Sequence, residues 1–369
     1  MSFLDLGVSK DIVKGLKELG IKTPTRIQEQ SIPILLNDNV DFIGQAQTGT
    51  GKTAAFGIPL LSKIDPNENK IQALILAPTR ELGQQISKQL FKFTKYTDKV
   101  FSEAVYGGEK IDIQIKRLQR PTHIIVATPG RLVDLIGKKV IDLSSVNTVV
   151  LDEADEMLSM GFKADLEKIL SFIKGSRNVW LFSATIPSTL DDIIRKYLRN
   201  NAVNIKIGKA ESVNKLIDHQ YVVIDPVAKL DTLTYFLKSN KGERGIIFTR
   251  TKSTARELYK QLWAKNYKVG ILEGEMTQKD RDKALRAFKN KSLQLLVSTD
   301  VAARGIDVAN LGFVVHYELP DQTDYYTHRS GRTGRAGKSG LSIAFVSRNE
   351  IPQIKSLERE LGIRFLQIR

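Results

Sequence analysis

The chain contains 369 residues, a length that predicts two domains and excludes a single small module. Its composition, 41% hydrophobic and 26% charged, is typical of globular proteins and excludes a largely disordered chain. Lys and Arg number 56 against 41 Asp and Glu, and the net charge of +15 favours a polyanionic partner, either nucleic acid or an acidic membrane surface. Residues 1–207 hold 28 basic and 23 acidic side chains and residues 208–369 hold 28 and 18, so the second half is the more basic. Such an excess is also found on ordinary solvated surfaces, so charge alone does not identify the partner.

The absence of cysteine excludes disulfides and thiolate metal sites and predicts a reducing, cytoplasmic location. Residues 1–17 place Asp5 and Asp11 among apolar positions at helical spacing, unlike a secretory signal. No stretch approaches the roughly 18 apolar residues of a membrane span. The four histidines lack the spacing of metal ligands, so we expect no zinc.

Short runs of Ile, Val and Leu alternate with amphipathic stretches along the chain. In the first half they predict buried parallel strands over 73–77, 124–127, 148–151 and 179–182, with a last strand near 203–207. In the second half they predict strands over 245–248, 293–298, 313–316 and 342–346. Alternating strands and helices predict an α/β fold with two helix-covered parallel sheets. We place the first domain at 1–207, a polar linker at 208–216 and the second domain at 217–369.

A glycine-rich segment over 46–53 follows one predicted strand and opens a predicted helix, as a phosphate-binding loop does. Its glycines let backbone N–H groups face phosphates, Lys52 can reach the β- and γ-phosphates, and Thr53 can ligate Mg²⁺. The segment departs from the strict pattern because Ala46 stands where a glycine is usual. The residues predicted to bind nucleotide here are Ala46, Gln47, Thr48, Gly49, Thr50, Gly51, Lys52 and Thr53.

An acidic cluster over 152–155 directly follows the strand predicted at 148–151, at the end where parallel sheets bind ligands. Asp152 suits the Mg²⁺ shell, and Glu153 can polarise the attacking water. By itself the cluster also fits acidic residues at a helix N-terminus. The phosphate-binding loop favours the catalytic interpretation.

Because it contains these two motifs, the sequence resembles the DEAD-box family of ATP-dependent RNA helicases, in particular the bacterial type of helicase core. The resemblance extends over nearly the whole chain, and the family-like signatures occur in the expected order. They include Thr25 to Gln28, Pro78 to Leu82, Gly107-Gly108, Thr128 to Arg131, Asp152 to Asp155, Ser183 to Thr185, Thr299 to Asp307 and His328 to Arg335. The resemblance implies two RecA-like domains that bind ATP and RNA between them.

The resemblance also implies roles for nucleotide-binding and catalytic residues. Gln28, with Thr25, matches the motif that reads adenine, and Phe3 matches an upstream aromatic residue near the base. Ile21 stands where an aromatic residue is common. In the second domain Asp307 matches the ribose contact, and Arg332 and Arg335 match arginines that reach the γ-phosphate. Residues implied to couple the domains are His328, Asp155, Ser183 and Thr185.

The RNA contacts implied by the resemblance combine hydroxyls, glycines and arginines, which suit phosphate and 2′-OH groups and predict sequence-nonspecific binding. In the first domain they are Pro78, Thr79, Arg80, Gly107, Gly108, Thr128, Gly130 and Arg131. In the second they are Gly274, Gln278, Arg281, Thr299 and Asp300. Glu273 stands where relatives often have histidine.

The expected function is RNA-stimulated ATP hydrolysis by a monomeric core that separates short duplexes and also binds single-stranded RNA. The expected cofactors are ATP and Mg²⁺, and no membrane partner is expected. Two alternatives remain at this point: a DNA-directed helicase, and an ATP-gated RNA clamp or ribonucleoprotein assembly scaffold.

Overall fold

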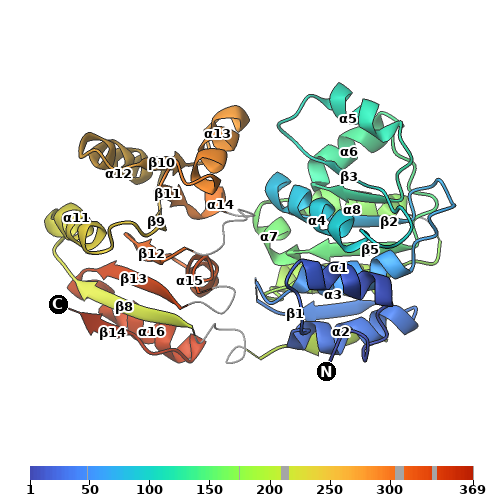
Figure 1. The fold of residues 1–369 in the computed structure, drawn as a ribbon, viewed down its shortest axis with the longest axis horizontal. Coiled ribbons are helices and arrows are strands. Elements are labelled where there is room, and N and C mark those ends of the chain that lie inside the picture. Colours follow the sequence, from blue (N-terminus) through green and yellow to red (C-terminus); the bar gives the residue numbers. More distant parts are fainter. Residues whose placement is uncertain (48, 174, 209–215, 304–310, 335–338, 369) are drawn as a thin grey trace. The chain divides into compact units, whose positions relative to one another are not determined.

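The computed structural model describes residues 1–368 except 48, 174, 209–215, 304–310 and 335–338. The chain divides into two compact units, Met1–Gly208 and Lys209–Arg369 (Figure 1). Most of the linker predicted over 208–216 lies outside the described residues. Within the part of the chain that is described, no helix is both long and apolar enough to cross a membrane.

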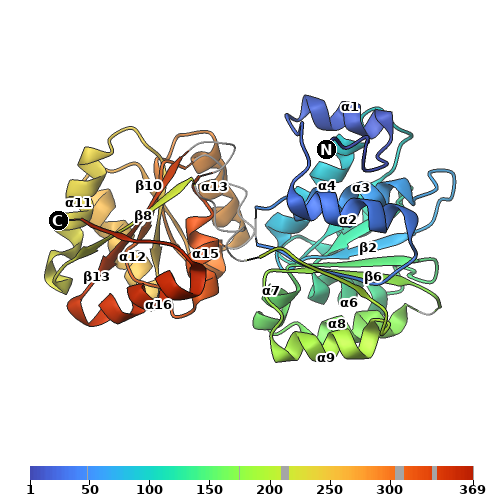
Figure 2. The same ribbon diagram turned by 90° about the horizontal axis from the view of Figure 1, so that it is seen from below.

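The described residues of the first unit form a seven-stranded parallel sheet with the strand order β3-β4-β2-β5-β6-β1-β7. The strands are β1 (Phe42–Gln45), β2 (Ala73–Leu76), β3 (Ser102–Val105), β4 (Ile124–Ala127), β5 (Thr148–Asp152), β6 (Asn178–Ser183) and β7 (Val203–Lys206). The helices are α1 (Lys10–Glu18), α2 (Arg26–Asn37), α3 (Lys52–Ser62), α4 (Arg80–Phe93), α5 (Ile111–Leu118), α6 (Pro129–Gly137), α7 (Ala154–Ser159), α8 (Lys163–Phe172) and α9 (Ser188–Tyr197). Helices α1 to α4 cover one face of the sheet, and α6 to α9 cover the other (Figure 2).

The apolar runs formed the predicted strands because both faces of the central strands are buried. Every residue of β2, β4 and β5 is buried, as expected for strands covered on both faces by helices. The predictions over 73–77, 124–127, 148–151 and 179–182 are therefore confirmed to within about two residues. Strand β3 was not predicted, because it lies at the edge of the sheet and three of its four residues are only partly buried.

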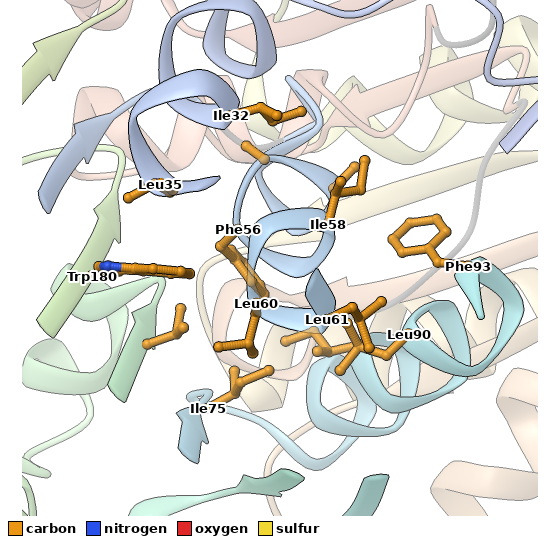
Figure 3. Close-up of a cluster of buried hydrophobic side chains, with 14 of the residues drawn as sticks. Ile32, Leu35, Phe56, Ile58, Leu60, Leu61, Ile75, Leu90, Phe93 and Trp180 are labelled. Atoms are coloured by element: carbon orange, nitrogen blue, oxygen red, sulfur yellow. The ribbon is translucent and has the colours of Figure 1, made fainter. Parts of the chain in front are cut away.

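Helix α3 lies within the apolar core on one side of this sheet. Figure 3 shows Phe56 and Leu60 of α3 pointing toward Trp180 and Ile75 of the sheet, with Leu90 of α4 on another side. Phe56 also packs on Phe182, with ring centroids 5.3 Å apart. This packing holds the N-terminus of α3 in a fixed place above the sheet.

The second unit repeats this architecture, and its seven-stranded parallel sheet has the order β10-β11-β9-β12-β13-β8-β14 in the described residues. The strands are β8 (Ile217–Val223), β9 (Gly245–Thr249), β10 (Val269–Leu272), β11 (Leu295–Thr299), β12 (Phe313–His316), β13 (Gly340–Val346) and β14 (Leu366–Ile368). The helices are α11 (Lys229–Ser239), α12 (Lys252–Ala264), α13 (Gln278–Lys289), α14 (Asp300–Ala303), α15 (Thr323–Ser330) and α16 (Ile351–Leu361), with short 3₁₀ turns at Pro226–Ala228 and Arg348–Glu350.

Two of the four histidines belong to a buried polar network beneath α15. His219 Nδ1 lies 2.7 Å from the Tyr326 hydroxyl, which lies 3.2 Å from Ser342 Oγ. His316 Nε2 lies 3.0 Å from the same Ser342 oxygen, and its ring stacks on Tyr326 with centroids 4.5 Å apart. Burial lowers the pKa of His316 well below its usual value and raises the pKa of Tyr326 above its usual value. The network therefore favours neutral side chains.

We expect this network to make the chain less stable as the pH falls from about 6.5 to about 4. Burial lowers the pKa of His219 to about 4, whereas an unfolded histidine titrates near pH 6.5, so the unfolded chain takes up the proton first. The contribution of His219, about 3 kcal/mol, is fully present above pH 6.5 and is lost between these two pKa values. Denaturant unfolding at several pH values should show a weaker pH dependence for His219→Asn than for the unaltered chain. An equally steep pH dependence in both proteins would contradict the assignment.

Candidate functional site

The candidate site of the first unit lies at the carboxyl edge of its sheet. Strands β2, β5, β6 and β1 are neighbours and run parallel, so the segments that follow them emerge side by side. These segments are the phosphate-binding loop after β1, the acidic cluster after β5 and the Ser183 to Thr185 segment after β6. Parallel α/β sheets bind ligands at this edge.

The phosphate-binding loop is attached to the sheet at its start and to α3 at its end. The backbone N–H of Ala46 donates to the Ser183 carbonyl at 2.9 Å, and the Thr50 hydroxyl donates to the Gln47 carbonyl at 2.7 Å. Gly49 and Gly51 have φ values of +86° and +92°, a region in which side chains are strained. The loop conformation therefore requires these two glycines. Thr48 lies outside the described residues.

Lys52 is the first residue of α3, and its side chain is buried. Its Nζ has no hydrogen-bond partner within the described residues. A buried ammonium without a partner is costly, which favours an anionic ligand at this position. Because the N-terminus of α3 also presents backbone N–H groups there, phosphate is the anion that fits best.

Asp152 and Glu153 stand where β5 meets α7. Asp152 is buried, and burial raises the pKa of its carboxyl to about 7 although the Lys52 ammonium opposes this shift. A cation at the carboxylate would offset this burial. Glu153 is in the left-handed region, with φ +51° and ψ +51°, a conformation that costs a non-glycine residue about 1–3 kcal/mol. Such strain commonly occurs at functional sites.

The predicted adenine-reading residue Gln28 contacts the phosphate-binding loop. Its Oε1 accepts from the Thr25 backbone N–H at 2.9 Å, and its Nε2 donates to the Gly51 carbonyl at 3.0 Å. The Thr25 hydroxyl donates to the Thr50 carbonyl at 2.7 Å. These bonds use about half of the hydrogen-bonding capacity of the amide. The sequence did not predict this contact, because Gln28 and Gly51 are far apart along the chain.

Asp155 joins the acidic cluster to the end of β6. Its Oδ2 accepts from both the backbone N–H and the hydroxyl of Thr185 at 2.9 Å. Ser183 Oγ accepts from the Asp155 backbone N–H at 3.2 Å and donates to the Thr185 carbonyl at 2.7 Å. The three predicted coupling residues of this unit are thus one hydrogen-bonded group.

The predicted RNA residues of the first unit follow β2, β3 and β4, which are adjacent in the order β3-β4-β2. Thr79 and Thr128 precede α4 and α6 as their N-terminal caps, and Gly107 and Gly108 are exposed after β3. The other members of this set are Pro78, Arg80, Gly130 and Arg131. All eight residues lie along one stretch of the carboxyl edge, continuous with the segments that follow β5, β6 and β1.

Two arginines of this set have side chains that contact other residues of the first unit. The Arg80 guanidinium lies 4.7 Å from the centroid of the Tyr106 ring, and Arg131 donates from Nη1 and Nη2 to the Glu109 carbonyl at 3.0 and 3.1 Å. Because these contacts orient the side chains without a ligand, the arginines are preorganised at this edge.

In the second unit, the predicted RNA residues lie after β10 and β11 and at the start of α13. Gly274 lies two residues after the end of β10, Thr299 is the last residue of β11, and Gln278 is the first residue of α13. Arg281 donates to the Ala302 carbonyl at 2.7 Å. Glu273, which replaces a frequent histidine, is buried and accepts from Arg256 Nη2 at 2.7 Å.

Asp300 has a protein partner that the sequence analysis missed. Both of its carboxylate oxygens accept from Arg329, at 2.6 and 2.7 Å, and the Arg329 side chain is 1% exposed. Arg329 also donates to the Glu318 carbonyl at 2.7 Å. The ion pair therefore connects the end of β11 to α15, the helix that carries His328. Arg329 stands within the 328–335 motif, but nothing in that string distinguishes a buried arginine from an exposed one.

The remaining predicted residues are distributed as follows. Phe3 is buried in the apolar core of the first unit, and its contact with a base stays a prediction. His328 is partly buried on α15, and Arg332 is buried just after that helix. Asp307 and Arg335 lie outside the described residues. Within the described ranges, no group of three or more His, Cys, Asp or Glu residues could hold a metal ion by itself.

Comparison with known families covers both units. The family described as DEAD/DEAH box helicase matches residues 25–193, and the helicase conserved C-terminal domain matches residues 228–337. A DEAD-box ATP-dependent RNA helicase CshA of Bacillus licheniformis is 43% identical over 97% of this chain and 73% of its own length. This chain belongs to the DEAD-box helicase family.

Other relatives agree with that membership. CshA of Streptococcus pneumoniae is 44% identical over 97% of this chain and 68% of its own length. The solved structure of S. cerevisiae Dbp5 bound to RNA and ADP BeF3 matches with a TM-score of 0.90 and 32% identity, covering 100% of this chain and 95% of that one. A DEAD box protein from the hyperthermophile Methanococcus jannaschii is 38% identical with a TM-score of 0.59, covering 100% and 99%. The predicted pair of RecA-like domains is confirmed.

We expect Asp155→Asn to destabilise the first unit by about 1–3 kcal/mol. The carboxylate accepts from Thr185 through Oδ2 and from the Glu156 N–H through Oδ1. Whichever way the asparagine amide is turned, its NH2 group faces one of these donors and leaves it unsatisfied. Asp134→Asn is the matched control, because that carboxylate is 63% exposed. Denaturant unfolding of both variants measures the difference, and equal stabilities would show that the Asp155 bonds contribute nothing.

Proposed function

We propose that this chain is an RNA-stimulated ATPase and ATP-dependent RNA helicase that separates short duplexes without reading their sequence. The observation that carries this proposal is the buried Lys52 ammonium at the start of α3, which has no hydrogen-bond partner among the described residues and lies close enough to Asp152 to oppose the rise in the pKa of that carboxyl. The predicted RNA residues continue along the same edge of the sheet. The names of the CshA relatives and the RNA-bound Dbp5 structure support this proposal. The cysteine-free composition suits a reducing cytoplasm, where we expect the chain to act.

ATP would bind with its phosphates over the loop that precedes α3. Lys52 would hold the β- and γ-phosphates, and the glycines would bring backbone N–H groups close to them. Thr53 and Asp152 would hold Mg²⁺, which typically takes only one or two protein ligands when it is bound with phosphates. When bound, Mg²⁺ neutralises charge that develops on the phosphates. The buried Asp152 carboxyl fits this role, because its ionised form needs a cation nearby.

Glu153 would accept a proton from the attacking water. The left-handed backbone at Glu153 is a strained feature of the kind that persists where function requires it. The family resemblance assigns Arg332 and Arg335 to the γ-phosphate, a role that needs a permanently charged planar group. Residues of both units would then be needed for turnover.

RNA would be held by its phosphates and 2′-OH groups. The set that would make these contacts in the first unit contains two helix N-termini, two exposed glycines and two preorganised arginines, and it lacks a base-stacking aromatic side chain. Because these groups are the same in every nucleotide, binding through the RNA backbone alone would not depend on the base sequence. The hydrogen-bonded residues Asp155, Ser183 and Thr185 would couple nucleotide binding to the conformation of the rest of the unit.

We expect Lys52→Ala and Glu153→Gln to separate binding from chemistry. Loss of the Lys52 ammonium should weaken ATP binding about 10- to 100-fold, because charge-assisted bonds contribute about 1.5–3 kcal/mol. Glu153→Gln keeps the side-chain shape, so ATP binding should persist while turnover falls about 10²- to 10⁴-fold. ATP affinity and RNA-stimulated phosphate release should be measured on both variants. Normal turnover of Glu153→Gln would remove this residue from the mechanism.

We also expect ATP to be preferred over GTP by at least about tenfold. A glutamine amide can donate and accept at once, which matches the edge of adenine, whereas guanine presents the opposite pattern there. Gln28→Ala should lower both the selectivity and the affinity, because it also removes the bond to the Gly51 carbonyl. Competition between the two nucleotides for the unaltered chain and for Gln28→Ala measures this. Equal hydrolysis of both by the unaltered chain would overturn the assignment of Gln28.

A further inference from the structure

The edge of the first-unit sheet beside β3 carries a cavity of about 380 Å³. It lies between α4, which contributes Lys88 and Phe91, and β3 with the residues around it, which contribute Phe101 and Ala104. The phosphate-binding loop does not line it, and neither does any residue predicted to bind RNA. One end of the cavity reaches Tyr106, whose ring lies against Arg80.

The backbone of β3 has one unpaired side. The carbonyl of Phe101 accepts from His123 N–H at 2.9 Å, and that of Val105 accepts from Thr128 N–H at 3.0 Å, so these residues face β4. In a parallel ladder, alternate residues face opposite neighbours. Ser102 and Ala104 therefore direct their backbone groups away from β4, where no described strand pairs with β3. The Ser102 carbonyl accepts there from the Ser87 hydroxyl of α4 at 3.3 Å, which leaves mainly the backbone of Ala104 and the Ser102 N–H for pairing. An open strand edge of this kind is a template for an added strand.

Two phenylalanines are exposed beside this edge. Phe91 on α4 is 71% exposed and Phe101 is 44% exposed, and both line the cavity. Val100 and Ala104 add further apolar surface to the wall. Exposed aromatic side chains that gather around a hollow are typical of a docking surface, whereas a single exposed one is ordinary.

The charge around the cavity is positive. Lys88 and Lys92 are exposed and four residues apart, and so are neighbours on the surface of α4. Lys99 is exposed beside Val100. None of these three lysines forms an ion pair within the described part of the chain. Glu103 also lines the cavity, and Arg117 lies 2.8 Å from its carboxylate but also pairs with Glu109, so these three side chains leave one negative charge against the three lysines.

We propose that the β3 edge binds an extended acidic peptide segment of a partner protein. The segment pairs with the backbone of Ala104 and with the Ser102 N–H, and it places an apolar side chain in the cavity against Phe91 and Phe101. Its acidic side chains lie near Lys88, Lys92 and Lys99. Main-chain bonds and a side-chain pocket together are the pattern of peptide recognition by strand addition.

RNA fits this surface less well than a peptide does. An unpaired strand edge presents both N–H donors and C=O acceptors, and a phosphodiester backbone offers mainly acceptors to meet them. The Ala104 carbonyl would face phosphate oxygens. An extended peptide satisfies both kinds of backbone group.

The test uses the full chain and a short fluorescent peptide in which glutamate alternates with valine and phenylalanine. Fluorescence anisotropy should show saturable binding that Phe91→Ala weakens at least about tenfold, as expected for an aromatic anchor. The double substitution of Lys88→Glu with Lys92→Glu should weaken binding similarly. RNA-stimulated ATP turnover should stay unchanged in both variants, so failure of this proposal is distinguishable from failure of the proposed function.

The first unit offers a matched control on α8. Lys168 and Phe172 are exposed and four residues apart on that helix, which covers the face of the sheet opposite α4. Phe172→Ala and Lys168→Glu should leave peptide affinity within about twofold of the unaltered chain. A peptide methylated on the backbone nitrogens of every second residue tests strand pairing, because only one of the two possible sets faces β3. Methylation of the nitrogens that face β3 should abolish binding, and methylation of the other set should leave it intact.

Three results would overturn the proposal. The first is the absence of saturable peptide binding, and the second is equal affinity for the unaltered chain and Phe91→Ala. The third is a loss of affinity for a labelled single-stranded oligouridylate in Phe91→Ala while peptide binding persists, which would assign the surface to RNA.

Discussion

The parallel direction of β1, β5 and β6 is the constraint on which the rest of the candidate site depends. Because all three strands end at one edge, the phosphate-binding loop, the acidic cluster and the Ser183 to Thr185 segment lie side by side although they are far apart in sequence. Both faces of these strands are covered by apolar helices, so the edge is rigid. A site built on such an edge can hold several charged groups in fixed positions.

The buried charged residues of the candidate site differ between the two units in how far protein groups satisfy them. In the first, Lys52 and Asp152 are buried with few protein partners, an arrangement that disfavours the empty site and favours a bound ion and phosphate. In the second, the Arg329 and Asp300 pair is satisfied within the unit by two short bonds. Removing one member of such a pair leaves an uncompensated buried charge, so this pair supports the position of α15, and the RNA contact of Asp300 stays a prediction.

Sequence patterns identified the continuously apolar strands and the edge strand β7, but not the edge strand β3. Strands β2, β4 and β5 were predictable because their residues are continuously apolar. Strand β3 was missed because Ser102, Glu103 and Ala104 carry no apolar run, and the position of an edge strand depends on pairing with β4. The Phe91 and Phe101 surface was missed for a related reason, since exposure of an aromatic residue is decided by what packs on it.

The sequence by itself determined the α/β class, the order of the motifs and the residue types that can bind phosphate, a divalent ion and an RNA backbone. These follow from local properties, namely hydrophobic periodicity, glycine content and side-chain chemistry. Only the tertiary structure decided that Gln28 bonds to Gly51, that Arg329 is buried against Asp300 and that one side of β3 has no partner strand among the described residues. Each of these depends on contacts between residues distant in the chain, which strand order and helix packing establish and local pattern does not encode.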